Sequence, residues 1–135
     1  SVLRELVALA ERTELLYDAE GLLESLVARE EACSTALPRG FAIPHPVRPM
    51  PYATAEAMIC LGRVTGGVGF GDPEGKLTYL FFLICCHDHR HHLTVLARLM
   101  RMLDLPTIEG LITAETESEA RELLRARELL VSRSP

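Results

Sequence analysis

Apolar residues recur every three or four positions along the first thirty residues, which is the spacing of one face of a helix. The spacing predicts one helix over residues 2–16. It predicts a second over residues 19–32, which Asp18 can cap. The positions expected to face inward are Leu3, Leu6, Val7 and Ala10 in the first helix and Leu22, Leu23, Leu26 and Val27 in the second.

A continuous apolar stretch, LTYLFFLICC at residues 77–86, predicts a strand that is buried on both faces and lies at the centre of a sheet. Residues 55–64, AEAMICLGRV, predict another strand. Between the two, TGGVGFGDPEGK at residues 65–76 contains five glycines and a proline. That composition predicts a turn or loop, with room for a short strand at residues 68–70, and a hairpin is the favoured arrangement.

The helical spacing returns after the apolar strand. HHLTVLARLMRML, residues 91–103, predicts a helix that ends before Pro106; Thr107 can cap a short helix through Ile112, and Ser118 can open a last one. The inward positions expected in the first of these helices are Leu93, Leu96, Leu99, Met100 and Leu103. Helices before and after strands predict an α/β layered fold rather than a helical bundle, in a single domain over residues 1–135.

Composition supports one globular domain, since 48% of the 135 residues are hydrophobic and 24% are charged. A net charge of −5 and the lack of a Lys/Arg run argue against a nucleic-acid surface. The longest apolar run, residues 80–86, is far shorter than the roughly 20 residues of a membrane helix, and the N-terminus is amphipathic rather than signal-like. We therefore expect a cytoplasmic protein that does not insert into membranes.

The four cysteines are Cys33, Cys60, Cys85 and Cys86, and no two of them form a C-x-x-C pair. They lie in or beside apolar stretches, and we expect them to be reduced thiols that pack as small hydrophobic side chains. We assign them no chemistry and expect no cofactor.

The histidines stand out by their placement. His45 lies in RGFAIPHPVRPMPY, residues 39–52, between Pro44 and Pro46, which restrict the backbone on both sides and suit a side chain that must be aimed. The other four histidines lie in CCHDHRHH, residues 85–92, where the central strand ends and a helix begins. Open α/β sheets bind ligands at such junctions, and helix N-termini favour anions. These histidines with a nearby arginine predict a phosphoryl site.

The stretch REEACSTALPRGFAIPH, residues 29–45, resembles the pattern R-E-x-x-x-S-T followed by G-x-A-I-P-H. This pattern is typical of the enzyme IIA domains of the fructose–mannitol and nitrogen-regulatory class of the bacterial phosphoenolpyruvate-dependent phosphotransferase system. The resemblance continues through GVGF at residues 67–70 and an H-L-x-x-L helix start that begins at His92. It implies an α/β fold with a mixed β-sheet flanked by helices on both faces.

The resemblance also implies a phosphohistidine carrier. His45 would take a phosphoryl group from phospho-HPr or a nitrogen-branch relative, and would pass it to a cysteine of an enzyme IIB domain or keep it as a regulatory mark. His92 would face His45, Arg29 would support the site and Thr35 would donate a hydrogen bond. The residue types fit this chemistry, because a neutral imidazole offers a lone pair near pH 7 and a guanidinium stabilises the charge of the transferred group.

Two departures from the family pattern concern the ends of the motif. The family follows P-H with a small and a basic residue, whereas here Pro46 begins PVRPMPY, so Arg48 either docks a partner or has no role. The family's first strand precedes its first helix, and this chain begins with the helix. We therefore expect an N-terminal portion to be missing or fused elsewhere in a longer chain, with Ser1 at a domain boundary.

Two other readings of the sequence stay open. The first is a degenerate module that keeps the fold and binds a partner without carrying phosphate. The second is a metal site, because His87 and His91 have the i, i+4 spacing of two ligands on a helix and Asp88 can be a third.

Overall fold

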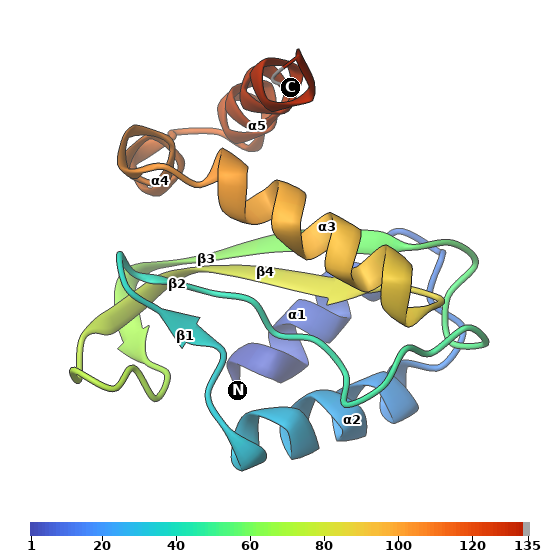
Figure 1. Cartoon of the computed structure of the whole chain (residues 1–135). Coiled ribbons are helices and arrows are strands. Elements are labelled where there is room, and N and C mark those ends of the chain that lie inside the picture. The colour runs from blue at the N-terminus through green and yellow to red at the C-terminus, as the bar shows by residue number, and fades with distance from the viewer. Residues whose placement is uncertain (134–135) are drawn as a thin grey trace. The chain divides into compact units, whose positions relative to one another are not determined.

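A four-stranded mixed sheet forms the centre of the N-terminal part of the chain in the computed structural model, which describes residues 1–133 (Figure 1). The strands are β1 (Ala36–Leu37), β2 (Phe41–Ala42), β3 (Met58–Gly69) and β4 (Leu77–Cys85), and their order in the sheet is β1-β2-β4-β3. β4 runs parallel to β2 and antiparallel to β3. The predicted α/β class with a mixed sheet is confirmed.

β4 is the buried central strand that its apolar sequence predicts. Every residue from Leu80 to Cys86 is at most 2% exposed. Alternate side chains of a strand point to opposite faces, and Phe81, Leu83 and Cys85 share one of them. These three residues pack in one hydrophobic cluster with the apolar faces of the first two helices.

These two helices, α1 (Val2–Glu11) and α2 (Ala19–Ala32), lie together on one face of the sheet (Figure 1). α2 has the predicted bounds, and the Asp18 carboxylate accepts a hydrogen bond of 2.9 Å from the Gly21 amide as the predicted N-cap. Two predictions are wrong: α1 ends at Glu11 rather than residue 16, and Val27 is 37% exposed. α1 stops early because Thr13 Oγ1 donates to the Ala10 carbonyl at 2.6 Å and Glu14 adopts a positive φ of 63°.

The glycine-rich segment is strand over more residues than the short strand allowed at residues 68–70, because β3 also takes in residues 65–67. β3 continues to Gly69 with a shift of register between Arg63 and Val68. Gly67, whose φ is +73°, permits this irregularity, because a Cβ there would lie 2.7 Å from the Tyr79 ring. The predicted hairpin turn follows, with Asp72 Oδ2 accepting hydrogen bonds from the Glu74 and Lys76 amides.

Three further helices follow the sheet: α3 (His89–Met102), α4 (Leu105–Thr113) and α5 (Glu117–Arg133). The described chain forms two compact units that divide within α3, between His92 and Leu93. In the second unit Arg127 pairs with Asp104 at 2.9 Å and donates through Nε to the Met102 carbonyl at 3.3 Å. These bonds join α5 to the connection between α3 and α4.

The ends of these helices differ in detail from the prediction. Asp104, not Thr107, caps α4 by accepting from the Thr107 amide at 3.0 Å, and Pro106 lies in the first turn of α4 rather than ending α3. Pro is well placed there because the first helical amides have no partner within the helix. At α5 the Thr116 hydroxyl, not Ser118, accepts from the Glu119 amide.

The buried face of α3 is narrower than predicted. Leu99 and Met102 are buried, whereas Leu93 is 52% and Met100 45% exposed. At 3.6 residues per turn, Leu93 and Met100 lie about 100° or more around the helix from Leu99. The prediction of five inward positions is therefore wrong for these two.

All four cysteines are free thiols. Cys85 and Cys86 are buried as expected, and desolvation raises the pKa of Cys85 to about 11. Cys33 differs from the prediction, because it follows the last residue of α2 and is exposed. No helix within residues 1–133 combines the length and the apolar character that crossing a bilayer needs.

Candidate functional site

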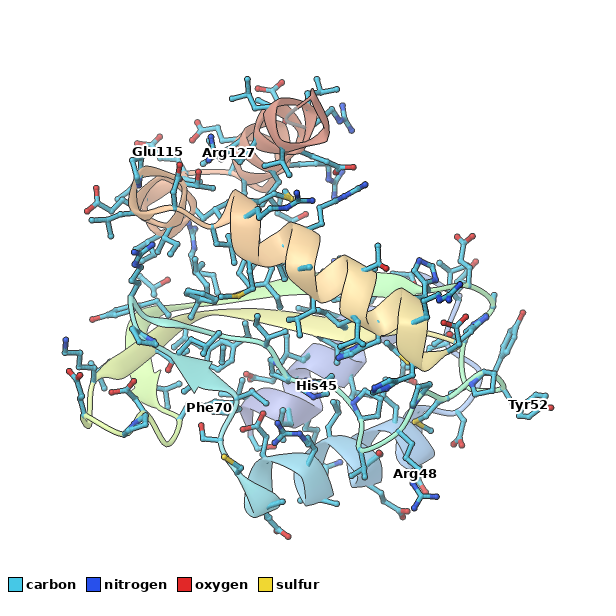
Figure 2. The ribbon with its side chains drawn as sticks, in the orientation of Figure 1. His45, Arg48, Tyr52, Phe70, Glu115 and Arg127 are labelled. Carbon is cyan, nitrogen blue, oxygen red and sulfur yellow. The ribbon has the colours of Figure 1, made fainter. Side chains whose placement is uncertain are left out.

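His45 lies on the loop that follows β2, and this loop is tied to two neighbouring elements. The carbonyl of Pro44 accepts from the Ile84 amide of β4 at 3.0 Å, and the Val47 amide donates to Ser25 Oγ of α2 at 2.8 Å. Pro44 and Pro46 are buried on either side of the histidine. Figure 2 shows His45 on this loop, with Arg48 and Tyr52 further along it pointing away from the histidine. The backbone around His45 is thus held from both sides.

The tautomer of His45 follows from a hydrogen bond of its ring. Nδ1 lies 2.8 Å from the carbonyl oxygen of Ile43. A carbonyl oxygen only accepts, so Nδ1 carries the hydrogen and Nε2 of the neutral ring has the free lone pair. The site therefore presents Nε2 as a nucleophile.

Two histidines of α3 meet His45 at a small pocket. The ring centroids of His45 and His92 are 4.8 Å apart, and those of His92 and His89 are 6.5 Å apart with nearly parallel planes. The pocket has a volume of about 80 Å³ and is lined by these three histidines together with Pro46, Val47, Pro49 and Cys86. Since about 10–15 Å³ accommodates one water, the pocket holds a small group.

The surroundings of the two central imidazoles favour their neutral forms. Burial lowers the pKa of His45, and the charge of Arg29 lowers it further, against the opposing effects of the Ile43 carbonyl and Glu30. Burial also lowers the pKa of His92, with smaller contributions from the charges of His45 and His89. Because both pKa values lie below the ordinary 6.5, both rings are neutral at pH 7. A neutral His45 is the form that can act as a nucleophile.

Arg29 lies in α2 and Thr35 in the segment after it, and neither lines the pocket. Arg29 donates through Nη1 to the Cys33 carbonyl at 2.6 Å, and its charge acts on His45. The Thr35 hydroxyl donates to the carboxylate of Glu30, which also accepts from the Thr35 amide at 2.9 Å. The Thr35 carbonyl in turn accepts from the Ile43 amide at 3.3 Å. Thr35 is thus connected to His45 through Ile43 and not by its hydroxyl.

Glu30 and His89 are candidate site residues that sequence reasoning missed. Glu30 stands beside Arg29 in the motif as the glutamate of R-E, which was a signal that could have found it. His89 precedes His92 by three residues, and residues at this spacing share a helix face. Once the start of α3 is known, this spacing indicates that His89 lies on the same helix face as His92.

The other two clustered histidines lie elsewhere. His87 precedes α3, and its Nε2 lies 2.9 Å from the carbonyl oxygen of Thr54 and 3.0 Å from its hydroxyl. His91 is exposed. His87 and His91 therefore do not sit on one helix as the metal hypothesis requires, and within residues 1–133 no three His, Cys, Asp or Glu side chains gather in a way that could hold a metal ion.

Comparison with known protein families shows to which family the chain belongs. The sequence model of the family described as "Phosphoenolpyruvate-dependent sugar phosphotransferase system, EIIA 2" matches residues 1–127. The chain belongs to this family. The EIIA identity proposed from residues 29–45 is thereby confirmed over most of the sequence.

The EIIA chain is similar to a fructose-specific component and to a nitrogen regulatory protein. It is 28% identical over 127 residues to the PTS system fructose-specific EIIABC component of Bacillus subtilis (strain 168), a match that takes in 92% of this chain but only 20% of the relative. The chain thus spans about a fifth of that relative's length. It is 31% identical to the nitrogen regulatory protein IIA-Ntr from Neisseria meningitidis, with a TM-score of 0.76 over 91% of this chain and 84% of that one.

The fold matches solved mannitol IIA structures as well. IIA mannitol from Escherichia coli has a TM-score of 0.79 at 22% identity, covering 91% of this chain and 86% of that one. The same TM-score is found for the IIA protein in the complex of enzyme IIAMTL and phosphorylated enzyme IIBMTL from Escherichia coli, at 21% identity over 93% and 85% of the two chains. At this identity the likeness establishes the shared fold.

Proposed function

We propose that this EIIA chain is a phosphohistidine carrier whose phosphoryl group is held on Nε2 of His45. The observation that carries the proposal is the hydrogen bond from Nδ1 of His45 to the Ile43 carbonyl, which leaves the lone pair on Nε2. The centroid of this ring lies 4.8 Å from that of His92. Burial and the charge of Arg29, which lower the pKa of His45, keep that lone pair available at pH 7.

The transfer is an in-line exchange of one phosphorus–nitrogen bond for another. A bond forms between Nε2 of His45 and phosphorus while the donor's phosphorus–nitrogen bond breaks, and the electron pair of that bond returns to the donor's ring nitrogen. In the onward step a cysteine thiolate attacks phosphorus and the pair returns to Nε2 of His45. Negative charge spreads over three equatorial oxygens, and Arg29 and His92 are the groups that stabilise it.

HPr or a nitrogen-branch relative is the proposed donor, and an enzyme IIB cysteine or a regulatory target is the proposed acceptor. The mannitol IIA relative of this fold forms a complex with phosphorylated enzyme IIB, and the other relatives include a fructose-specific component and a nitrogen regulatory protein. The output is sugar uptake or regulation. We propose that residues 1–135 act in the cytoplasm as a single EIIA domain, because the family match runs through both compact units.

Intact mass after incubation with phosphoenolpyruvate, enzyme I and HPr tests the proposal. The native chain is expected to gain one acid-labile phosphoryl group, and His45→Gln is expected to gain none. His91→Gln is the matched control, since His91 is exposed and does not line the pocket. A native chain that stays unmodified with HPr and with nitrogen-branch donors would instead indicate a module that binds partners without carrying phosphate.

A further inference from the structure

His89 is a residue of the pocket that the phosphocarrier chemistry above does not use. It is the first residue of α3, and its ring stacks on His92 with an interplanar angle of 23° and a centroid distance of 6.5 Å. It also lines the pocket that contains His45. The three imidazoles therefore form a row, His45–His92–His89, across one small cavity.

We propose that His89 is the third imidazole of the phosphoryl site, a positioning residue whose positive charge faces the phosphorylated His45 across His92. The inference rests on the proposed function, because it concerns the same site. His89 takes no part in bond making or breaking. It binds a proton and supplies positive charge next to His92, which in turn faces His45.

Phosphorylation of His45 makes the site more negative. In the unmodified protein a charge on His89 opposes a charge on His92 and lowers its pKa. A phosphoryl group brings a charge of about −1.5 to −2 at pH 7, which attracts protons to both neighbouring rings. His92 is half-buried and pays desolvation to hold a proton, whereas His89 is exposed. His89 is thus the ring that can become cationic with the least desolvation.

Charged and titratable groups from three other parts of the described chain lie near the row. Cys86 lines the pocket from the end of β4, and Arg29 and Glu30 of α2 act on His45 with opposite signs. Asp88 precedes His89, and its Oδ1 accepts from the His91 amide at 2.7 Å as part of the helix start. This carboxylate keeps its negative charge while it caps the helix. Burial raises the pKa of the pocket-lining Cys86 thiol, and the charge of Asp88 raises it further.

The test compares rates of phosphoryl gain from phospho-HPr at pH 6 and pH 8.5 in the native chain, His89→Gln, His89→Arg and the control His91→Gln. Acid favours the protonated form of an imidazole and alkali favours the neutral form. We expect the rate of phosphoryl gain by His89→Gln to be about tenfold below that of native at pH 6 and equal to it at pH 8.5. This loss is smaller than that expected for removing a hydrogen-bond donor to the phosphoryl group, because water screens an exposed charge. His89→Arg keeps its charge and should exceed native at pH 8.5, while His91→Gln should match native at both pH values.

A second readout separates this coupling from a structural role of the ring. Imidazole titration by NMR in the unmodified protein should show a higher His92 pKa in His89→Gln than in native, because one repelling charge is gone. Equal rates of native and His89→Gln at both pH values, or an unchanged His92 pKa, would overturn the inference while His45 still gains phosphate. A native chain that gains no phosphoryl group would overturn the proposed function and this inference together.

Discussion

The two segments that meet at the pocket fix their histidines in different ways. The loop after β2 brings one histidine, buried prolines on both sides of it and a ring nitrogen bound to the Ile43 carbonyl. The start of α3 brings His87, His89, His91 and His92 within six residues, and only two of these four line the pocket. The restrained backbone of the loop fixes the position of His45, whereas the helical spacing of α3 decides which of its histidines line the pocket.

The difference shows that the neighbours of a histidine decide its role, and that the density of histidines along the chain does not. His92 lies opposite His45, and His89 lies one turn before His92 on the same helix face. His87, which precedes α3, lies within hydrogen-bond distance of Thr54 instead. Variants that change one ring at a time test this difference.

The largest effect is expected for His92→Gln. This variant removes the ring that lies 4.8 Å from His45 and leaves the loop unchanged. The rate of phosphoryl gain from phospho-HPr should fall by about 100-fold, the loss typical of removing one group that stabilises developing charge. Stopped reactions followed by intact mass measure the rate, with His91→Gln as control. A rate within twofold of native would mean that His92 does not act on the phosphoryl group.

The opposite pattern is expected for His87→Ala, which should affect stability and not transfer. His87 Nε2 lies within hydrogen-bond distance of the carbonyl and the hydroxyl of Thr54, and Thr54 is buried. Losing this partner should lower the free energy of unfolding by about 1–3 kcal/mol. Urea unfolding measures the loss, and His91→Ala, at an exposed position, should stay within about 0.5 kcal/mol of native. A His87→Ala protein that gains phosphate slowly but is as stable as native would reverse the roles assigned to His87 and His92.

The parts of the fold that the sequence predicts well are those decided by local pattern. Asp18 caps α2 because its carboxylate reaches an amide three residues ahead, and β4 is central because nine neighbouring residues offer almost no polar side chain. The composition of the glycines in β3 is typical of a loop, but β4 pairs with this segment and holds residues up to Gly69 in a strand. Asp104 was passed over because either Asp104 or Thr107 satisfies the sequence rule for a cap.

The candidate site divides in the same way. Residues 29–45 carry a motif, so His45 and Arg29 could be named as candidates without a structure, and so could His92 near the start of the helix. The tautomer of His45 could not, because it depends on how the backbone bends the Ile43 carbonyl toward the ring. Nor could the attachment of Thr35 to Glu30, which needs the turn between α2 and β1.

Stability should depend on pH because the loop after β2 and the start of α3 each hold a histidine whose pKa is lowered. The pKa values of both His45 and His92 are lowered in the folded chain, so the unfolded chain binds more protons below about pH 6.5. The contribution of these rings is therefore fully present above about pH 6.5 and is lost as the pH falls toward their folded pKa values. The urea concentration at the midpoint of unfolding should be lower at pH 5.5 than at pH 7.5. This decrease should be smaller in the double variant His45→Gln/His92→Gln. Parallel falls in native and double variant would show that these rings are not the cause.

The smallest effect is expected where the loop is tied to α2. Ser25 Oγ accepts from the Val47 amide at 2.8 Å, two residues after His45, and Ser25→Ala removes this tie. Water can replace the lost partner at an exposed amide, so the free energy of unfolding should fall by only about 0.5 kcal/mol. Hydrogen exchange of the Val47 amide should become faster, and phosphoryl gain about two- to threefold slower, because His45 is aimed less firmly. Ser118→Ala on the exposed face of α5 is the control. Unchanged exchange at Val47 would mean that the prolines alone hold the loop, and that its restraint is a property of its own sequence.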